Sequence, residues 1–197
     1  MGRGSDAYAS QTATDWVSQA DHVAVLSVLS EKELPPTQEE QAAGEGLIGR
    51  EITVRVDKIL WSSPNPAHPA PSDTFSWTAD GWSFQGEERT AFTMAGSPRY
   101  EPGHTYIEAL KWEPEHRDED DITPAQWVGL GEGSSLPYDG GVIGKGEYQG
   151  ETVSASSFKS MEDDSAQGSL EEQMAGKTAS DLIAALNAAR PTTPPST

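Results

Sequence analysis

Alternating apolar and polar residues predict β-strands through the first two thirds of this chain. The longest candidate is residues 48–61, where Val54 and Val56 share one parity and Arg55 takes the other. We therefore expect Val54 in the core and Arg55 in solvent. At residues 59–61 the alternation breaks, which predicts a bulge or the end of strand pairing.

Other segments extend this pattern. Residues 23–29 are apolar on both parities, which is typical of a central strand covered on both faces. Strands are also predicted at 75–77, at 90–94 and at 105–112, the last directly after a Pro102-Gly103 turn of type II. Loops are predicted at 31–47, which is polar, at 62–72, which holds four prolines, and at 113–121, which is acidic.

Helices are predicted near both ends of the chain. Residues 13–20 can form one or two turns, and Thr123-Pro124 predicts a short helix at 125–127. A capping box at 178–181 begins a helix over 180–189. Its apolar stripe predicts docking on a β core, and consists of Leu182, Ile183, Leu186 and Ala189. The fold class is therefore mainly β, a β-barrel or sandwich with a C-terminal α-helix.

The chain divides into one domain and two tails. Residues 1–12 are interpreted as a cloning remnant followed by a flexible N-terminus. Residues 13–190 are expected to form a single β-rich domain, and the Pro-rich residues 191–197 a disordered tail. The glycine-rich segment 129–150 carries apolar residues throughout, so we expect it to be an ordered loop that wraps the sheet.

Charge and hydropathy exclude several partners. The chain has 13 Lys and Arg against 32 Asp and Glu, for a formal net charge of −19. Because phosphate backbones are bound by clustered basic residues, no nucleic-acid partner is expected. No apolar run approaches the roughly 18 residues of a membrane span, so no membrane insertion is expected.

No motif identifies a reaction centre. The chain has no Cys, its four His residues are scattered, and no His-Glu-x-x-His pair is present. We therefore predict no catalytic residues, no cofactor and no tight transition-metal site. Gly131 to Ser135 lacks the Gly-x-Ser-x-Gly spacing of a nucleophile elbow, and an ordered turn is the favoured interpretation.

Two weaker binding hypotheses remain. The acidic run supplies hard oxygen ligands for calcium at Asp118, Asp120 and Asp121, although it lacks the spacing of an EF-hand and a solvated loop is favoured. Among the aromatic residues, Trp82 and Trp127 are expected to be exposed at a ligand or partner surface, and Tyr138 is a further binding candidate. Core packing is the competing interpretation for each of them.

One family resemblance can be placed on specific segments. The stretch from Ala20 through Glu33, the DKILW ending of the next strand and the EPGHTYIEAL turn and strand resemble the netrin-like domain found in tissue inhibitors of metalloproteinases. The likeness covers about residues 15–112 and implies an OB-like barrel that binds ligands through its loops and one face. That family chelates zinc through an N-terminal cysteine, which this chain lacks. The whole chain also resembles secreted actinobacterial proteins with similar GEGLIGR and LPYDGGVIG stretches.

The function favoured by these observations is a non-enzymatic binding or interaction module, for a protein or a small ligand, that is secreted or at the cell surface. The Trp, Gly, Pro, Ser and Thr content suits such a location. The interpretation of the first residues as a cloning remnant leaves open whether a signal peptide or lipoprotein leader was removed. One alternative is a secreted hydrolase or hydrolase inhibitor whose site has no recognisable motif. A second alternative is a calcium-dependent surface protein.

Overall fold

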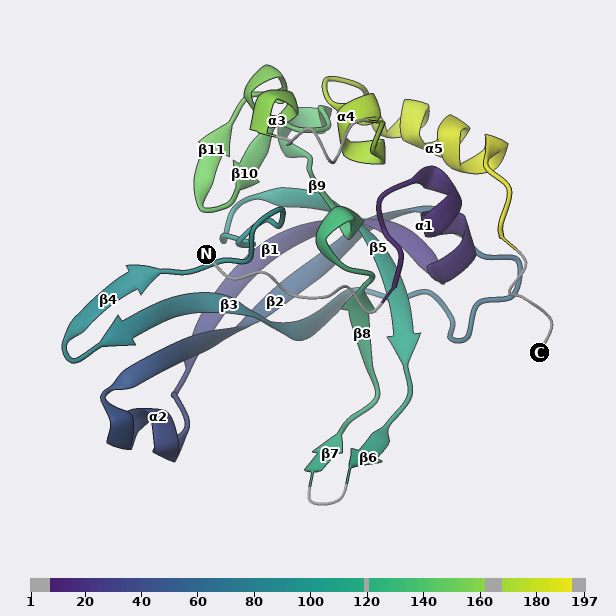
Figure 1. The fold of residues 1–197 in the computed structure, drawn as a ribbon. Coiled ribbons are helices and arrows are strands. Elements are labelled where there is room, and N and C mark those ends of the chain that lie inside the picture. Colours follow the sequence, from purple (N-terminus) through teal and green to yellow (C-terminus); the bar gives the residue numbers. More distant parts are fainter. Residues whose placement is uncertain (1–7, 119–120, 162–167, 193–197) are drawn as a thin grey trace.

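The computed structural model describes residues 8–118, 121–161 and 168–192, and most of its regular structure is strand. The main sheet is antiparallel, with the strand order β4-β3-β2-β1-β5-β8 and with β9 also paired to β5 (Figure 1). Its strands are β1 (His22–Leu34), β2 (Glu45–Ser62), β3 (Thr74–Gln85), β4 (Glu88–Ala91), β5 (Thr105–Glu113), β8 (Gln126–Gly129) and β9 (Ser135–Pro137). The mainly β class is confirmed.

Strand orientation follows the alternation in the sequence. Val54 is fully buried and Arg55 is exposed, as the pattern predicts. In β1, Val23 and Val25 contribute to one apolar cluster, and Ala24 and Leu26 contribute to the other. The prediction of a central strand covered on both faces is thereby confirmed. The pairing of β1 with β2 shifts register opposite residues 59–61, where the alternation breaks.

The sheet curls without closing. Within the described residues, β3 and β8 approach each other, but neither is hydrogen-bonded to the other as a neighbouring strand. The concave face holds the apolar cluster around Ile52, Val54, Tyr106 and Trp127. A closed barrel is therefore not formed, because β3 is paired to β2 and β4 while β8 is paired only to β5.

Helices cover the opposite face of the sheet (Figure 1). They are α1 (Ala13–Gln19), α3 (Ala155–Met161), α4 (Leu170–Met174) and α5 (Ala179–Ala188). The hairpin of β10 (Gly146–Tyr148) and β11 (Glu151–Val153) directly precedes α3 in the chain. Leu182 and Leu186 of α5 are buried in the same cluster as Trp16 of α1. The predicted docking of the C-terminal helix is confirmed.

Several loops differ from expectation. The segment 31–47 contains α2 (Gln38–Ala43), because Thr37 and Glu40 form a capping box. Residues 114–123 contain a hairpin of β6 (His116–Asp118) and β7 (Asp121–Thr123) in place of a simple acidic loop. The expected short helix at 125–127 is wrong, since these residues lead into β8 and pair with β5. Cross-strand pairing there outweighs the local helix-start signal.

Two further segments are more ordered than a loop or tail requires. Ser10 is fully buried and its carbonyl accepts a hydrogen bond from Trp16 Nε1 at 2.8 Å, although residues 8–12 fall in the stretch expected to be flexible. In the glycine-rich segment, Leu136, Ile143 and Tyr148 are buried beneath the helices. The expected order of residues 129–150 is confirmed, with short 3₁₀ turns at Glu132–Ser134 and Asp139–Gly141.

Candidate functional site

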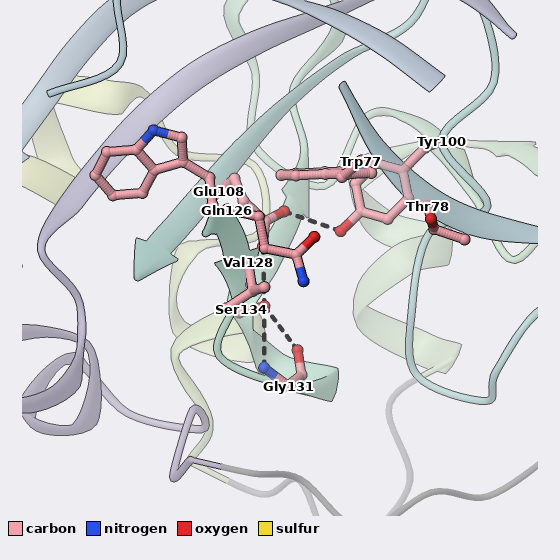
Figure 2. Close-up of a pocket in the computed structure, with 10 residues that line it drawn as sticks. Trp77, Thr78, Tyr100, Glu108, Gln126, Val128, Gly131 and Ser134 are labelled. Atoms are coloured by element: carbon pink, nitrogen blue, oxygen red, sulfur yellow. Dashed lines mark hydrogen bonds between the residues drawn. The ribbon is translucent and has the colours of Figure 1, made fainter. Parts of the chain in front are cut away.

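A pocket of about 350 Å³ lies where the partner strand of β5 is interrupted (Figure 2). β8 pairs with residues 110–113 of β5 and β9 pairs with residues 106–108, while residues 130–134 leave the ladder between them. The interruption leaves Glu108 to Leu110 of β5 at the junction between the two partner strands. The pocket is lined by Trp77, Thr78, Tyr100, Glu108, Gln126, Trp127, Val128, Gly129, Gly131 and Ser134.

Glu108 is the carboxylic acid in this lining, and β5 directs it inward. It shares its parity with Tyr106 and Leu110, which belong to the concave-face cluster, and it is fully buried. Gly129 makes room for it, because a Cβ at Gly129 would lie 2.6 Å from Glu108 Oε1. The strand pattern therefore carries an acid to a position where apolar side chains would normally pack.

The carboxyl group of Glu108 is held by two hydroxyls. The Tyr100 hydroxyl donates to Oε2 at 2.9 Å, as the dashed line in Figure 2 shows, and Ser134 Oγ lies 2.9 Å from Oε1. Ser134 Oγ also lies 2.7 Å from the carbonyl oxygen of Gly131. Because a hydroxyl has one proton, Ser134 donates a full two-centre hydrogen bond to only one of these oxygens, and a protonated Glu108 satisfies the other contact by donating to Ser134.

Burial also favours the protonated, neutral form of Glu108. Removal from water raises the pKa of Glu108 to about 8, and the hydroxyl hydrogen bonds offset only part of that rise. Glu108 is therefore mostly a neutral carboxylic acid at pH 7. It differs in this respect from ordinary surface carboxylates, which are ionised at that pH.

A second buried acid fixes Tyr100 in place. Glu147 Oε1 and Oε2 accept the backbone N–H groups of Arg99 and Tyr100, each at 3.0 Å, and Oε2 also accepts the Tyr106 hydroxyl at 2.6 Å. Tyr100 has a φ of 59°, a conformation that non-glycine residues adopt only when neighbouring contacts compensate. Glu147 supplies those contacts, so the Tyr100 hydroxyl is pre-positioned on Glu108.

Aromatic rings from three elements border the pocket. Trp77 of β3 meets Tyr100 edge to face at 5.4 Å between centroids. Trp127 of β8 is fixed on its other side by Trp112, at 5.1 Å, and by His22, at 5.5 Å. Each of these rings therefore packs against at least one other aromatic ring.

The three predicted binding aromatics lie in different places. Trp127 lines the pocket, but it is only 6% exposed, which corrects the expectation of an exposed ring. Trp82 is half-buried beneath Arg50, Arg89 and Arg99, whose guanidinium carbons lie 6.0, 5.6 and 5.0 Å from its centroid. Tyr138 is half-buried against the helix-side cluster. Trp127 alone of the three is therefore at the pocket.

Sequence reasoning missed Glu108, Tyr100 and Ser134. One signal was available, because the predicted strand 105–112 places Glu108 on the same parity as Tyr106 and Leu110. A single acid on an otherwise apolar parity indicates a buried carboxyl. The contribution of Ser134 could not be read in this way, since it depends on where the turn at 131–135 folds back onto β5.

The histidines and acidic residues form no second centre in the part of the chain that the structure describes. No group of three or more His, Asp or Glu side chains there could hold a metal ion. Of the calcium candidates, Asp120 lies outside the described residues, and the side chains of Asp118 and Asp121 are not described either. His22 at the start of β1 contacts Ser62 at the end of β2 at 2.9 Å, and His104 contacts Asp139 at 2.6 Å.

Comparisons with protein-family models, with curated proteins and with solved structures each find no match for this chain.

Across residues 8–118, 121–161 and 168–192, no helix has both the length and the apolar character to cross a membrane.

Proposed function

We propose that this protein is a non-enzymatic binding module and that the pocket beside β5 is its site for a small ligand. The observation that carries the proposal is the lining, in which Trp77, Tyr100 and Trp127 border the same cavity as one buried, hydrogen-bonded carboxyl. Small-ligand sites are typically concave and mostly apolar, with a few fixed polar groups that orient the ligand. The volume of about 350 Å³ is at the lower end of such sites.

The same lining favours binding over hydrolysis. Glycoside hydrolysis by paired carboxylates needs two acids facing one another, and Glu108 is the one carboxyl among the residues that line this pocket. Ser134 is not poised as a nucleophile, because its hydroxyl is engaged by Gly131 as well as by Glu108. The secreted hydrolase is therefore the weaker alternative.

The finer architecture and the location are part of the proposal. The strong curl of an antiparallel sheet supports an OB-like, netrin-like arrangement that stops short of closure. A secreted or cell-surface location is supported by the composition of the chain. The proposed ligand site depends on neither the OB-like arrangement nor the location, because it rests on the residues that line the pocket.

Ligand screening by thermal shift tests the proposal, with Trp77→Ala as the pocket variant and Trp82→Ala as its matched control. Both residues are half-buried tryptophans of β3, but Trp82 lies outside the lining. We expect compounds from a mixed library of cationic, neutral and anionic molecules to raise the melting temperature of the wild type and of Trp82→Ala, and not of Trp77→Ala. A library without stabilising compounds, or with compounds that stabilise Trp77→Ala equally, would contradict the proposal.

A further inference from the structure

We propose that the ligand of this pocket is a small organic ammonium cation, bound between the aromatic rings and above Glu108. The inference rests on the proposed function and names its ligand class. It is drawn from the charges that face the pocket and from the ring faces that border it.

Glu108 lacks a positive partner among the groups that face it. Buried carboxylates are ordinarily paired with a base, because an isolated charge is costly to remove from water. The titratable groups around Glu108 are Tyr100 from the preceding loop, Tyr106 on the same strand and Glu147 on β10, and all of them are acids. No Lys, Arg or His is among the described residues that line the pocket.

The nearby buried arginines are committed elsewhere. Arg99 donates to the carbonyl oxygen of Gly81 at 2.8 Å and to the carboxylate of Glu101. Arg50 donates to the carbonyl oxygen of Asp80 at 2.6 Å and to Glu31. Neither arginine pairs with Glu108, which is neutral in the free protein, so a positive charge that stabilises its ionised form would come from a ligand.

The aromatic residues of the lining supply the second half of a cation site. Trp77, Tyr100 and Trp127 come from three different parts of the chain and border one cavity. Aromatic faces attract ammonium groups through the ring quadrupole, most strongly for Trp and most strongly when water is excluded. A pocket lined by three aromatic residues and one acid suits a quaternary or primary ammonium and gives no advantage to an anion.

The net charge of the whole chain also favours a cationic ligand. A formal charge of −19 raises the local concentration of cations and speeds their association. Binding of a cation also favours the ionised form of Glu108, so the proton held by the free protein is released. Affinity should therefore increase with pH up to about 8, where the free acid ionises by itself.

Calorimetric titration tests this inference with charged and uncharged ligands of the same shape. The probes are tetramethylammonium and choline, with 3,3-dimethylbutan-1-ol as the neutral carbon analogue of choline. We expect the wild type to bind choline at least tenfold more tightly than the neutral analogue. At pH 7, in buffers of different ionisation enthalpy, we expect binding of choline to release up to one proton.

Two variants separate the local charge of the pocket from the charge of the whole chain. Glu108→Gln keeps the shape of the protonated acid and should lose both the preference for choline and the proton release. Glu113→Gln removes an acid from the same strand outside the pocket, and should keep both.

Each remaining outcome has a definite meaning. The inference is overturned if neither ammonium binds more tightly than the neutral analogue, or if Glu108→Gln keeps the preference. If neutral or anionic compounds then bind in a way that depends on Trp77, the proposed function stands without the cation. If no compound binds at the pocket, both proposals fall.

Discussion

Glu108 occupies a position that strand alternation would give to an apolar side chain. Two hydroxyls, from Tyr100 and Ser134, hold its carboxyl, and no base neutralises it within the lining. The sequence shows that Glu108 lies on the same side of β5 as Tyr106 and Leu110. It does not show that hydroxyl groups hold the buried carboxyl there. The hydroxyls arrive from segments distant in the chain, and their approach depends on tertiary packing.

The unusual protonation of Glu108 has a measurable effect on stability. The folded state keeps the proton up to about pH 8, whereas a glutamate with its ordinary pKa of 4.5 loses it near that lower pH. Between these values the folded state binds more protons than the unfolded state, so the free energy of unfolding contributed by Glu108 falls as pH rises. The contribution is fully present below pH 4.5 and is lost as pH passes 8.

Glu108→Gln should remove that decline, since a glutamine side chain does not titrate. We expect the variant and the wild type to be similarly stable near pH 5, and the variant to be more stable near pH 9. The difference could reach about 5 kcal/mol as an upper bound from the pKa shift. Urea denaturation at a series of pH values measures it, and parallel pH profiles for the two proteins would show that Glu108 is not buried as a neutral acid.

At the scale of elements, the interruption between β8 and β9 creates the site. Gln126–Gly129 and Ser135–Pro137 pair with the same strand, and the residues between them leave it. The sequence indicated a helix start at 123–124, and pairing with β5 overrode it. By contrast, α5 was predicted well, because its capping box and apolar stripe are local features that persist in the fold.

The docking of α5 on α1 and β2 leads to a prediction about truncation. A chain that ends at Gly176 loses Leu182 and Leu186, which are buried in the helix-side cluster. We expect its free energy of unfolding to fall by at least about 3 kcal/mol, from the lost burial of two leucines. We also expect it to bind the dye ANS. Thermal melting and dye fluorescence measure both effects.

A chain that ends at Thr192 is the matched control for this truncation. It keeps α5 and the hydrogen bond from the Thr192 backbone N–H to Ser18 Oγ at 2.9 Å. Its melting temperature should match that of the full chain. Equal melting of the chain that ends at Gly176 would mean that α5 contributes nothing to the core.

For the whole molecule, the sequence predicts the mainly β fold class, but it does not predict whether the sheet closes into a barrel. Alternation and capping are local, and they correctly gave a mainly β chain with a C-terminal helix. Whether a curled sheet closes depends on the distance between β3 and β8, which are separated by about forty residues that include four other strands. The pocket lies at that open side, so the part of the fold hardest to predict is the part that carries the proposed function.

A nitrogen–proton correlation spectrum recorded during titration with choline tests the central claim most directly, because it locates binding on the whole molecule at once. We expect the largest shift changes at the indole N–H of Trp77 and Trp127 and at the backbone N–H of Gly129 and Gly131. The Trp82 indole, on the same strand as Trp77, should not move. Changes centred away from the pocket, or no changes at millimolar choline, would contradict the account.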